Sequence, residues 1–138
     1  MQNAHQTSLK GKKMKVGIIG AGSVGSATAF ALIMRGVARK VVLIDANEKK
    51  AQAEAMDIAH AAPFAYANKV KAGTYEDLKG AEVVIVTAGA NQKPGETRID
   101  LLGRNAKIFE SIIPQVAKYA PDTIPVSYTH LRAHETSA

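Results

Sequence analysis

Short apolar runs alternate with longer amphipathic stretches along this chain of 138 residues. Apolar runs predict strands at 15–19, 41–44 and 83–87, a weaker run predicts one at 69–72, and a fifth strand should begin near Thr123. Runs that are apolar at every position are typical of parallel strands buried on both faces. The pattern therefore predicts a parallel sheet that is covered on both sides.

The stretches between these strands have helical periodicity and predict helices at 22–35, 47–62 and 98–119. In the first of them, the residues at helical spacing are Val24, Thr28, Ala31, Leu32 and Arg35. Pro63 should end the second helix, and Pro114 should kink the third. Strands that alternate with helices imply right-handed crossovers. The fold class expected is therefore α/β, with an open, doubly wound parallel sheet.

A glycine-rich turn, Gly20-Ala21-Gly22-Ser23-Val24-Gly25, joins the first predicted strand to the first helix. In the dinucleotide-binding fingerprint, the first glycine permits a tight turn and the second lets the backbone approach a pyrophosphate. The third lets the helix pack closely on the strand. The free N–H groups at the start of the helix would then face the phosphates.

A carboxylate, Asp45, follows the second predicted strand, 20 residues after Gly25. At this position it would accept hydrogen bonds from both ribose hydroxyls and would repel a 2′-phosphate, which favours NAD over NADP. The alternative is a plain strand–helix turn in another kind of α/β protein. The flanking strand, the helix and the spaced acid together favour a Rossmann nucleotide-binding fold.

The basic charge of the chain changes this picture little. The net charge is +6, and Lys10, Lys12 and Lys13 supply half of it from a polar segment without periodicity, residues 1–13. We expect this segment to be a disordered leader before a natural start at Met14, or else a short arm that packs on a partner subunit. The other basic residues are scattered and form no aromatic-rich basic face, so we expect no nucleic-acid binding.

Composition also narrows the classes of site and location. The chain has no cysteine, which removes disulfides, thiolate chemistry and most zinc sites, and we predict no metal site. No apolar run approaches the ~20 residues of a membrane span, and no signal peptide is visible. We therefore expect a cytoplasmic protein that does not associate with membranes.

A long polar loop, 88–98, follows the fourth predicted strand, at the edge of the sheet where doubly wound proteins bind their ligands. The loop is long enough to act as a lid. Arg98 could hydrogen-bond a substrate carbonyl oxygen and stabilise charge there, and Gln92 could set the shape and charge of the substrate. Each could instead be an ordinary surface residue. An arginine at a helix start opposes the helix dipole, which favours a functional reason for Arg98.

Together these motifs resemble the amino-terminal half of L-lactate dehydrogenases, in the lactate/malate dehydrogenase superfamily. The resemblance covers 14–124, and it is carried by the glycine turn, Asp45, Met56-Asp57-Ile58-Ala59-His60, Thr74-Tyr75-Glu76-Asp77 and the run from Thr87 to Asn105. The segment NQKPGETR, at 91–98, is far more specific than the glycine turn.

The resemblance implies an NAD-dependent oxidoreductase of glycolysis that transfers a hydride between NADH and pyruvate to form lactate. It implies that Arg98 is catalytic and binds substrate by polarising the ketone, and that Gln92 binds substrate at the position where malate dehydrogenases have arginine. Without that arginine a second substrate carboxylate would be unpaired. Cofactor contacts are implied at Gly20, Gly22, Ser23, Val24, Gly25, Asp45, Lys50, Tyr75, Thr87, Ala88, Gly89, Ala90 and Asn105. The parent enzyme should be a homo-oligomer, a tetramer or a dimer, and His60 should be structural.

The resemblance ends abruptly after Ile124. In the family, the proton-donor histidine with its aspartate, and a second arginine that clamps the substrate carboxylate, lie beyond the fifth strand. Residues 126–136 instead match the translation of a nucleotide string that resembles the end of a transposase adapter used in sequencing libraries. We therefore expect residues 125–138 to be a foreign tail, in which His130 and His134 form no site. Reamplification from source DNA should give a gene that diverges after Ile124, and an unbroken native frame through 126–136 would contradict this.

These expectations define an NAD-binding domain over 14–124 whose sheet is truncated in or before its fifth strand. Such a fragment should be marginally stable, prone to aggregate, weak or deficient in NAD binding, and inactive alone. One alternative is a fragment of a malate dehydrogenase or another 2-hydroxy-acid dehydrogenase, against which Gln92 argues. A stand-alone NAD-binding module is another, supported only by the short length and the missing catalytic residues.

Overall fold

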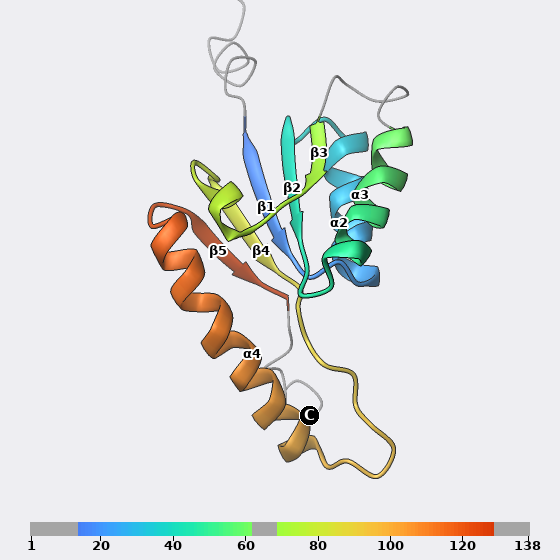
Figure 1. Ribbon diagram of the computed structural model, residues 1–138, viewed down its shortest axis with the longest axis vertical. Coiled ribbons are helices and arrows are strands. Elements are labelled where there is room, and N and C mark those ends of the chain that lie inside the picture. Colours follow the sequence, from blue (N-terminus) through green and yellow to red (C-terminus); the bar gives the residue numbers. More distant parts are fainter. Residues whose placement is uncertain (1–13, 62–68, 129–138) are drawn as a thin grey trace, which may run out of the picture.

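The computed structural model describes residues 14–61 and 69–128, in which helices alternate with parallel strands (Figure 1). The elements in chain order are β1 (Lys15–Ile19), α2 (Ser23–Met34), β2 (Lys40–Ile44), α3 (Glu48–Ala61), β3 (Lys69–Ala72), η2 (Tyr75–Leu78), β4 (Val83–Val86), α4 (Arg98–Tyr119) and β5 (Ile124–Ser127). The strands form one sheet in the order β3-β2-β1-β4-β5. The doubly wound α/β fold is therefore confirmed. The expected stop at Pro63 and the leader at 1–13 lie outside the described residues.

Helices cover the two faces of the sheet. α2 and α3 pack on one face, where Val16 and Ile18 of β1 contact a cluster that includes Ile33 of α2. η2 and α4 pack on the other face, where Ile19 of β1 joins Ile112 of α4. Successive strand residues point to opposite faces, so the central strands must be apolar at every position. This is why continuous apolar runs predicted these strands.

The outer side of α2 lines an open groove. Gly25, Ala29 and Ile33 are the buried residues of this helix, so its core-facing side consists mostly of small side chains. The residues whose helical spacing predicted this helix line the groove, together with Ile85 of β4 and Val126 of β5. They are Val24, Thr28, Ala31, Leu32 and Arg35. None of the helices in the described part of the chain is both long and apolar enough to cross a membrane.

The fifth strand is present, so the expected truncation of the sheet requires correction. β5 begins at Ile124, close to the expected start, and pairs with β4 from Val83 opposite Ile124 to Val86 opposite Ser127. Strand pairing uses backbone groups, so this segment can pair whatever its origin. All four residues of β5 are exposed, and Pro125 is tolerated because the strand lies at the sheet edge. A foreign origin for 125–138 stays a prediction, and residues 129–138 lie outside the described part.

Candidate nucleotide-binding site

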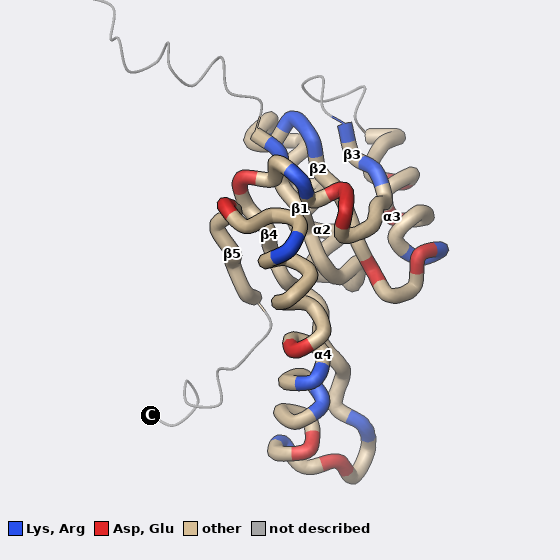
Figure 2. The backbone as a smooth tube through the Cα atoms, turned by 60° about the vertical axis from the view of Figure 1, so that its left-hand side comes forward, with Lys and Arg blue, Asp and Glu red and all other residues tan. Residues whose placement is uncertain are grey.

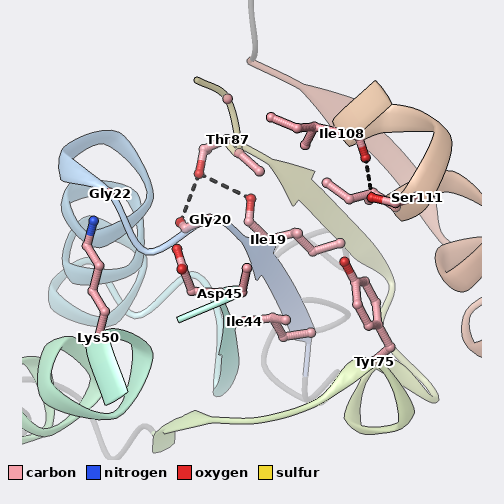
Figure 3. A pocket seen from close by; sticks show the side chains of 14 residues that line it. Ile19, Gly20, Gly22, Ile44, Asp45, Lys50, Tyr75, Thr87, Ile108 and Ser111 are labelled. Carbon is pink, nitrogen blue, oxygen red and sulfur yellow. Dashed lines mark hydrogen bonds between the residues drawn. The ribbon is translucent and has the colours of Figure 1, made fainter. Parts of the chain in front are cut away.

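A cavity of about 430 Å³ opens at the carboxyl ends of β1, β2 and β4 (Figure 3). It lies where the chain order reverses, because β2 and β4 leave β1 on opposite sides. Open α/β sheets bind their ligands at this kind of position. The cavity is lined by Ile19, Gly20, Gly22, Ile44, Asp45, Ala46, Lys50, Tyr75, Thr87, Ala88, Gly89, Ile108, Ser111 and Ile112.

The glycine turn forms one wall of the cavity. Gly20 has a φ of 113°, and a Cβ there would come within 2.6 Å of the Ala88 backbone nitrogen. A Cβ on Gly25 would overlap the Gly20 carbonyl oxygen, and the Thr87 hydroxyl, which donates to that oxygen over 3.0 Å, would lie 2.8 Å away. Both glycines are therefore required by the packing of the protein itself.

Gly22 differs from these two glycines because a Cβ added there would meet no atom within 4 Å. Gly22 lines the cavity and is the N-cap of α2, whose first turn has no acidic side chain and no side-chain cap. The first N–H groups of a helix need partners from outside the helix, and phosphate oxygens suit them. The open space at Gly22 and the uncapped helix start therefore fit a diphosphate.

Asp45 is held at the end of β2 by two backbone donors. Its Oδ2 accepts a hydrogen bond from Ala21 N at 2.8 Å, and its Oδ1 accepts one from Asn47 N at 2.8 Å. Each carboxylate oxygen has a second lone pair, which a ligand hydroxyl could use. The carboxylate thus stands beside the glycine turn with its orientation fixed, as recognition of a ribose diol requires.

The opposite wall is mostly apolar. Tyr75 of η2 lies there with Ile108 and Ile112 of α4, and the Ser111 hydroxyl donates to the Ile108 carbonyl at 2.7 Å (Figure 3). Burial raises the pKa of Tyr75, so its phenol stays protonated near neutral pH. Such a wall suits a flat, weakly polar ring. Sequence reasoning missed the three α4 residues, although their i, i+3, i+4 spacing puts them on one helix face.

Several predicted site residues lie outside this cavity. Ser23 and Val24 line the groove beside α2, and Gly25 is buried beneath the turn. Asn105 is buried and accepts a hydrogen bond from Ala90 N at 2.9 Å, so these two residues hold the loop that leaves the cavity. The other predicted cofactor contacts, Gly20, Gly22, Asp45, Lys50, Tyr75, Thr87, Ala88 and Gly89, lie in the cavity wall.

The two predicted substrate residues lie on the loop and at the start of α4. Arg98 is the first residue of α4, and its side chain is exposed. Thr97 caps this helix in a reciprocal pair with Asp100. Gln92 is exposed, and its Nε2 donates to the Glu96 carbonyl at 2.9 Å. Neither side chain lines the cavity, although the loop that carries Gln92 begins in its wall at Thr87.

Comparisons with known proteins agree with this geometry. The family model for the NAD binding domain of lactate/malate dehydrogenases matches residues 14–128. An L-lactate dehydrogenase of Geotalea daltonii is 55% identical in an alignment 127 residues long, which covers 87% of this chain and 41% of that protein. A minor L-lactate dehydrogenase of Enterococcus mundtii has a similar structure, with a TM-score of 0.80 and 45% identity over 83% of this chain and 37% of its own.

A malate dehydrogenase of Archaeoglobus fulgidus, solved in complex with NADH, is similar at a TM-score of 0.77 and 40% identity, over 83% of this chain and 40% of its own. The chain thus spans about two-fifths of the length of the relatives it matches. The family match identifies NAD as the cofactor, and the residues that line the cavity suit a dinucleotide. This chain belongs to the lactate/malate dehydrogenase family and contains its NAD-binding domain.

Proposed function

We propose that this chain is the nucleotide-binding part of an NAD-dependent L-lactate dehydrogenase, which interconverts pyruvate and lactate. The proposal rests mainly on the course of one loop. This loop begins in the cavity wall at Thr87 and ends at Arg98, the first residue of α4. This loop carries the neutral amide of Gln92. The L-lactate dehydrogenases among the similar proteins support the assignment.

The residues of the cavity have distinct roles in this proposal. Gly22 and the start of α2 would hold the diphosphate, and the Asp45 carboxylate would accept hydrogen bonds from the ribose hydroxyls. Tyr75 and Ile112 would pack against the base. When bound, NADH supplies the hydride. Contacts from Ser23, Val24, Ala90 and Asn105 to the cofactor, which the family resemblance implies, remain predictions.

The substrate would be recognised from the loop. The Arg98 guanidinium would donate hydrogen bonds to the ketone oxygen and stabilise the negative charge that develops there. Gln92 carries no charge, so a substrate with a second carboxylate would be desolvated without a partner for it. The neutral Gln92 side chain therefore favours pyruvate over oxaloacetate.

No imidazole, the usual proton donor near neutral pH, lies in the cavity wall among the described residues of this chain. His60, the one histidine among them, is exposed on α3 and does not line the cavity. Reduction of a ketone to an alcohol needs a proton as well as a hydride. We therefore propose that turnover requires further polypeptide of the dehydrogenase, in a cytoplasmic tetramer or dimer.

Because β5 is present, the purified 138-residue chain should bind NADH measurably, in contrast to the weak or absent binding expected for a truncated sheet, but it should not catalyse lactate-dependent NADH formation. Binding should appear as a change in NADH fluorescence when the chain is titrated with NADH. Turnover would appear as a rise in NADH absorbance when lactate and NAD are supplied. The expected result is a measurable dissociation constant and no rate above the protein-free control. Sustained NADH formation by the chain alone would contradict the proposed dependence on further polypeptide.

A full-length dehydrogenase that contains this chain should reduce pyruvate with a kcat/KM about a hundredfold or more above that for oxaloacetate, because Gln92 leaves a second carboxylate unpaired. The measurement is the initial rate of NADH oxidation with each substrate at matched concentrations. A preference for oxaloacetate would assign the chain to a malate dehydrogenase instead.

A further inference from the structure

A paired guanidinium and carboxylate fasten the loop to the second turn of α4. Arg104 donates from Nε to Glu96 Oε1 at 2.6 Å and from Nη2 to Glu96 Oε2 at 2.7 Å. The same Nη2 donates to the Asn91 carbonyl at 2.8 Å, so one side chain holds both limbs of the loop. The Glu96 side chain is only 11% exposed, although it belongs to a surface loop.

The Glu96 carboxylate and carbonyl organise the residues between these limbs. Lys93 N donates to Glu96 Oε2 at 2.8 Å, and Gln92 Nε2 donates to the Glu96 carbonyl oxygen at 2.9 Å. The side chain proposed to select the substrate is thus bound to the residue that Arg104 holds. Asn105, the next residue of α4, holds the start of the loop through Ala90.

Core packing contributes little to the order of this region. The loop and the first turns of α4 extend beyond the sheet, and this part of the chain carries charges of both signs (Figure 2). Asn105 is the one buried residue among 98–107, and α4 joins the apolar core only from Ile108 onward. The position of the loop must therefore depend chiefly on its polar contacts with α4.

An isolated surface ion pair contributes little to stability, so the geometry of this pair matters. Two parallel N–H···O bonds from one guanidinium to one carboxylate are the stronger, directional kind. The hydrogen bonds from Arg104 lower the pKa of Glu96 because they favour the charged carboxylate. The backbone N–H of Lys93 contributes a smaller effect in the same direction. The pair therefore persists throughout the neutral range.

We propose that Arg104 is a positioning residue for substrate selection: its pairing with Glu96 fixes Gln92 relative to Arg98, so that the loop and the first two turns of α4 form one body. The fastening of the loop is independent of the reaction. Its consequence for substrate choice rests on the function proposed above. Arg104 itself does not line the cavity and is not expected to touch the cofactor.

Hydrogen exchange on the whole 138-residue chain tests this fastening, with Arg104→Gln as the variant and Lys107→Gln as the matched control. Both changes remove one positive charge from α4 and insert a residue of similar helix propensity, and Lys107 is exposed. In R104Q, exchange of the Lys93 amide should accelerate on the order of tenfold, because its acceptor is no longer fixed. K107Q should exchange like the wild type, and wild-type exchange in R104Q would overturn the proposal.

Two further readouts separate positioning from a general loss of structure. The side-chain amide signal of Gln92 in a ¹⁵N–¹H spectrum should move to the free-glutamine position in R104Q but not in K107Q. Arg104→Ala should behave like R104Q. In R104A, added guanidinium ion should restore the Gln92 signal, because it can occupy the space beside Glu96 that the arginine side chain has left. A Gln92 signal that is unchanged in R104Q, or no recovery with guanidinium, would count against positioning by Arg104. None of these outcomes depends on lactate chemistry, so failure of the proposed function would be seen separately.

Discussion

Replacing Gly25 with alanine should destabilise the domain by about 3 kcal/mol or more, because the new methyl group has no room that the fold can yield. It would overlap the Gly20 carbonyl oxygen and crowd the Thr87 hydroxyl, which itself bonds to that oxygen. Backbone atoms cannot move aside as a flexible side chain can, so α2 would have to shift away from β1. Thermal unfolding followed by circular dichroism should show a fall in Tm of roughly 10 °C or more.

Two other glycine substitutions serve as controls for this result. Unlike Gly25→Ala, Gly103→Ala within α4 places its methyl group where no atom lies within 4 Å. It should stabilise the chain by about 0.5–1 kcal/mol through helix propensity. Gly22→Ala should lower Tm far less than Gly25→Ala, yet it should weaken NADH binding because the methyl group is added at the cavity wall. Equal Tm values for the Gly22 and Gly25 variants would refute this division between packing and binding glycines.

The different roles of these glycines show how far the sequence alone could lead. The apolar runs located the strands because both faces of the sheet are covered, and the spacing from Gly25 to Asp45 located the carboxylate beside the turn. The fingerprint assigned close helix packing to Gly25 and ligand approach to Gly22, and the positions of these glycines agree with it. A Cβ on Gly25 would meet the Gly20 carbonyl, whereas one on Gly22 would meet nothing, although the motif could not name the atoms that distinguish them. That distinction depends on the distance between α2 and β1 in three dimensions.

The features that the sequence did not predict depend on long-range geometry. Ile108 and Ile112 reach the cavity because α4 packs across the sheet opposite α2, which helical spacing alone does not specify. The pairing of Glu96 with Arg104 joins a loop to a helix, and no local motif encodes it. β5 forms from backbone pairing with β4, and the family model matches through residue 128, so the resemblance expected to end after Ile124 did not imply that the strand is lost.

Asp45→Asn should shift the cofactor preference of the chain toward NADPH by about fivefold or more relative to NADH, since two like charges at contact distance repel by at least ~1 kcal/mol even when solvated. Asparagine has nearly the same shape and keeps one acceptor oxygen, but it has no charge to repel a 2′-phosphate. Dissociation constants for NADH and NADPH, measured by fluorescence titration, give the preference directly.

The ratio of the two constants is more informative than either constant alone. Asp45 also accepts hydrogen bonds from Ala21 N and Asn47 N, so D45N should lower the stability of the fold as well as change the site. Both cofactors bind the same folded population, so a change in the folded fraction cancels from the ratio. Asp57→Asn, on an exposed position of α3 away from the cavity, removes the same charge and should leave the ratio unchanged. A D45N ratio equal to that of the wild type would mean that Asp45 supports the turn without selecting the cofactor.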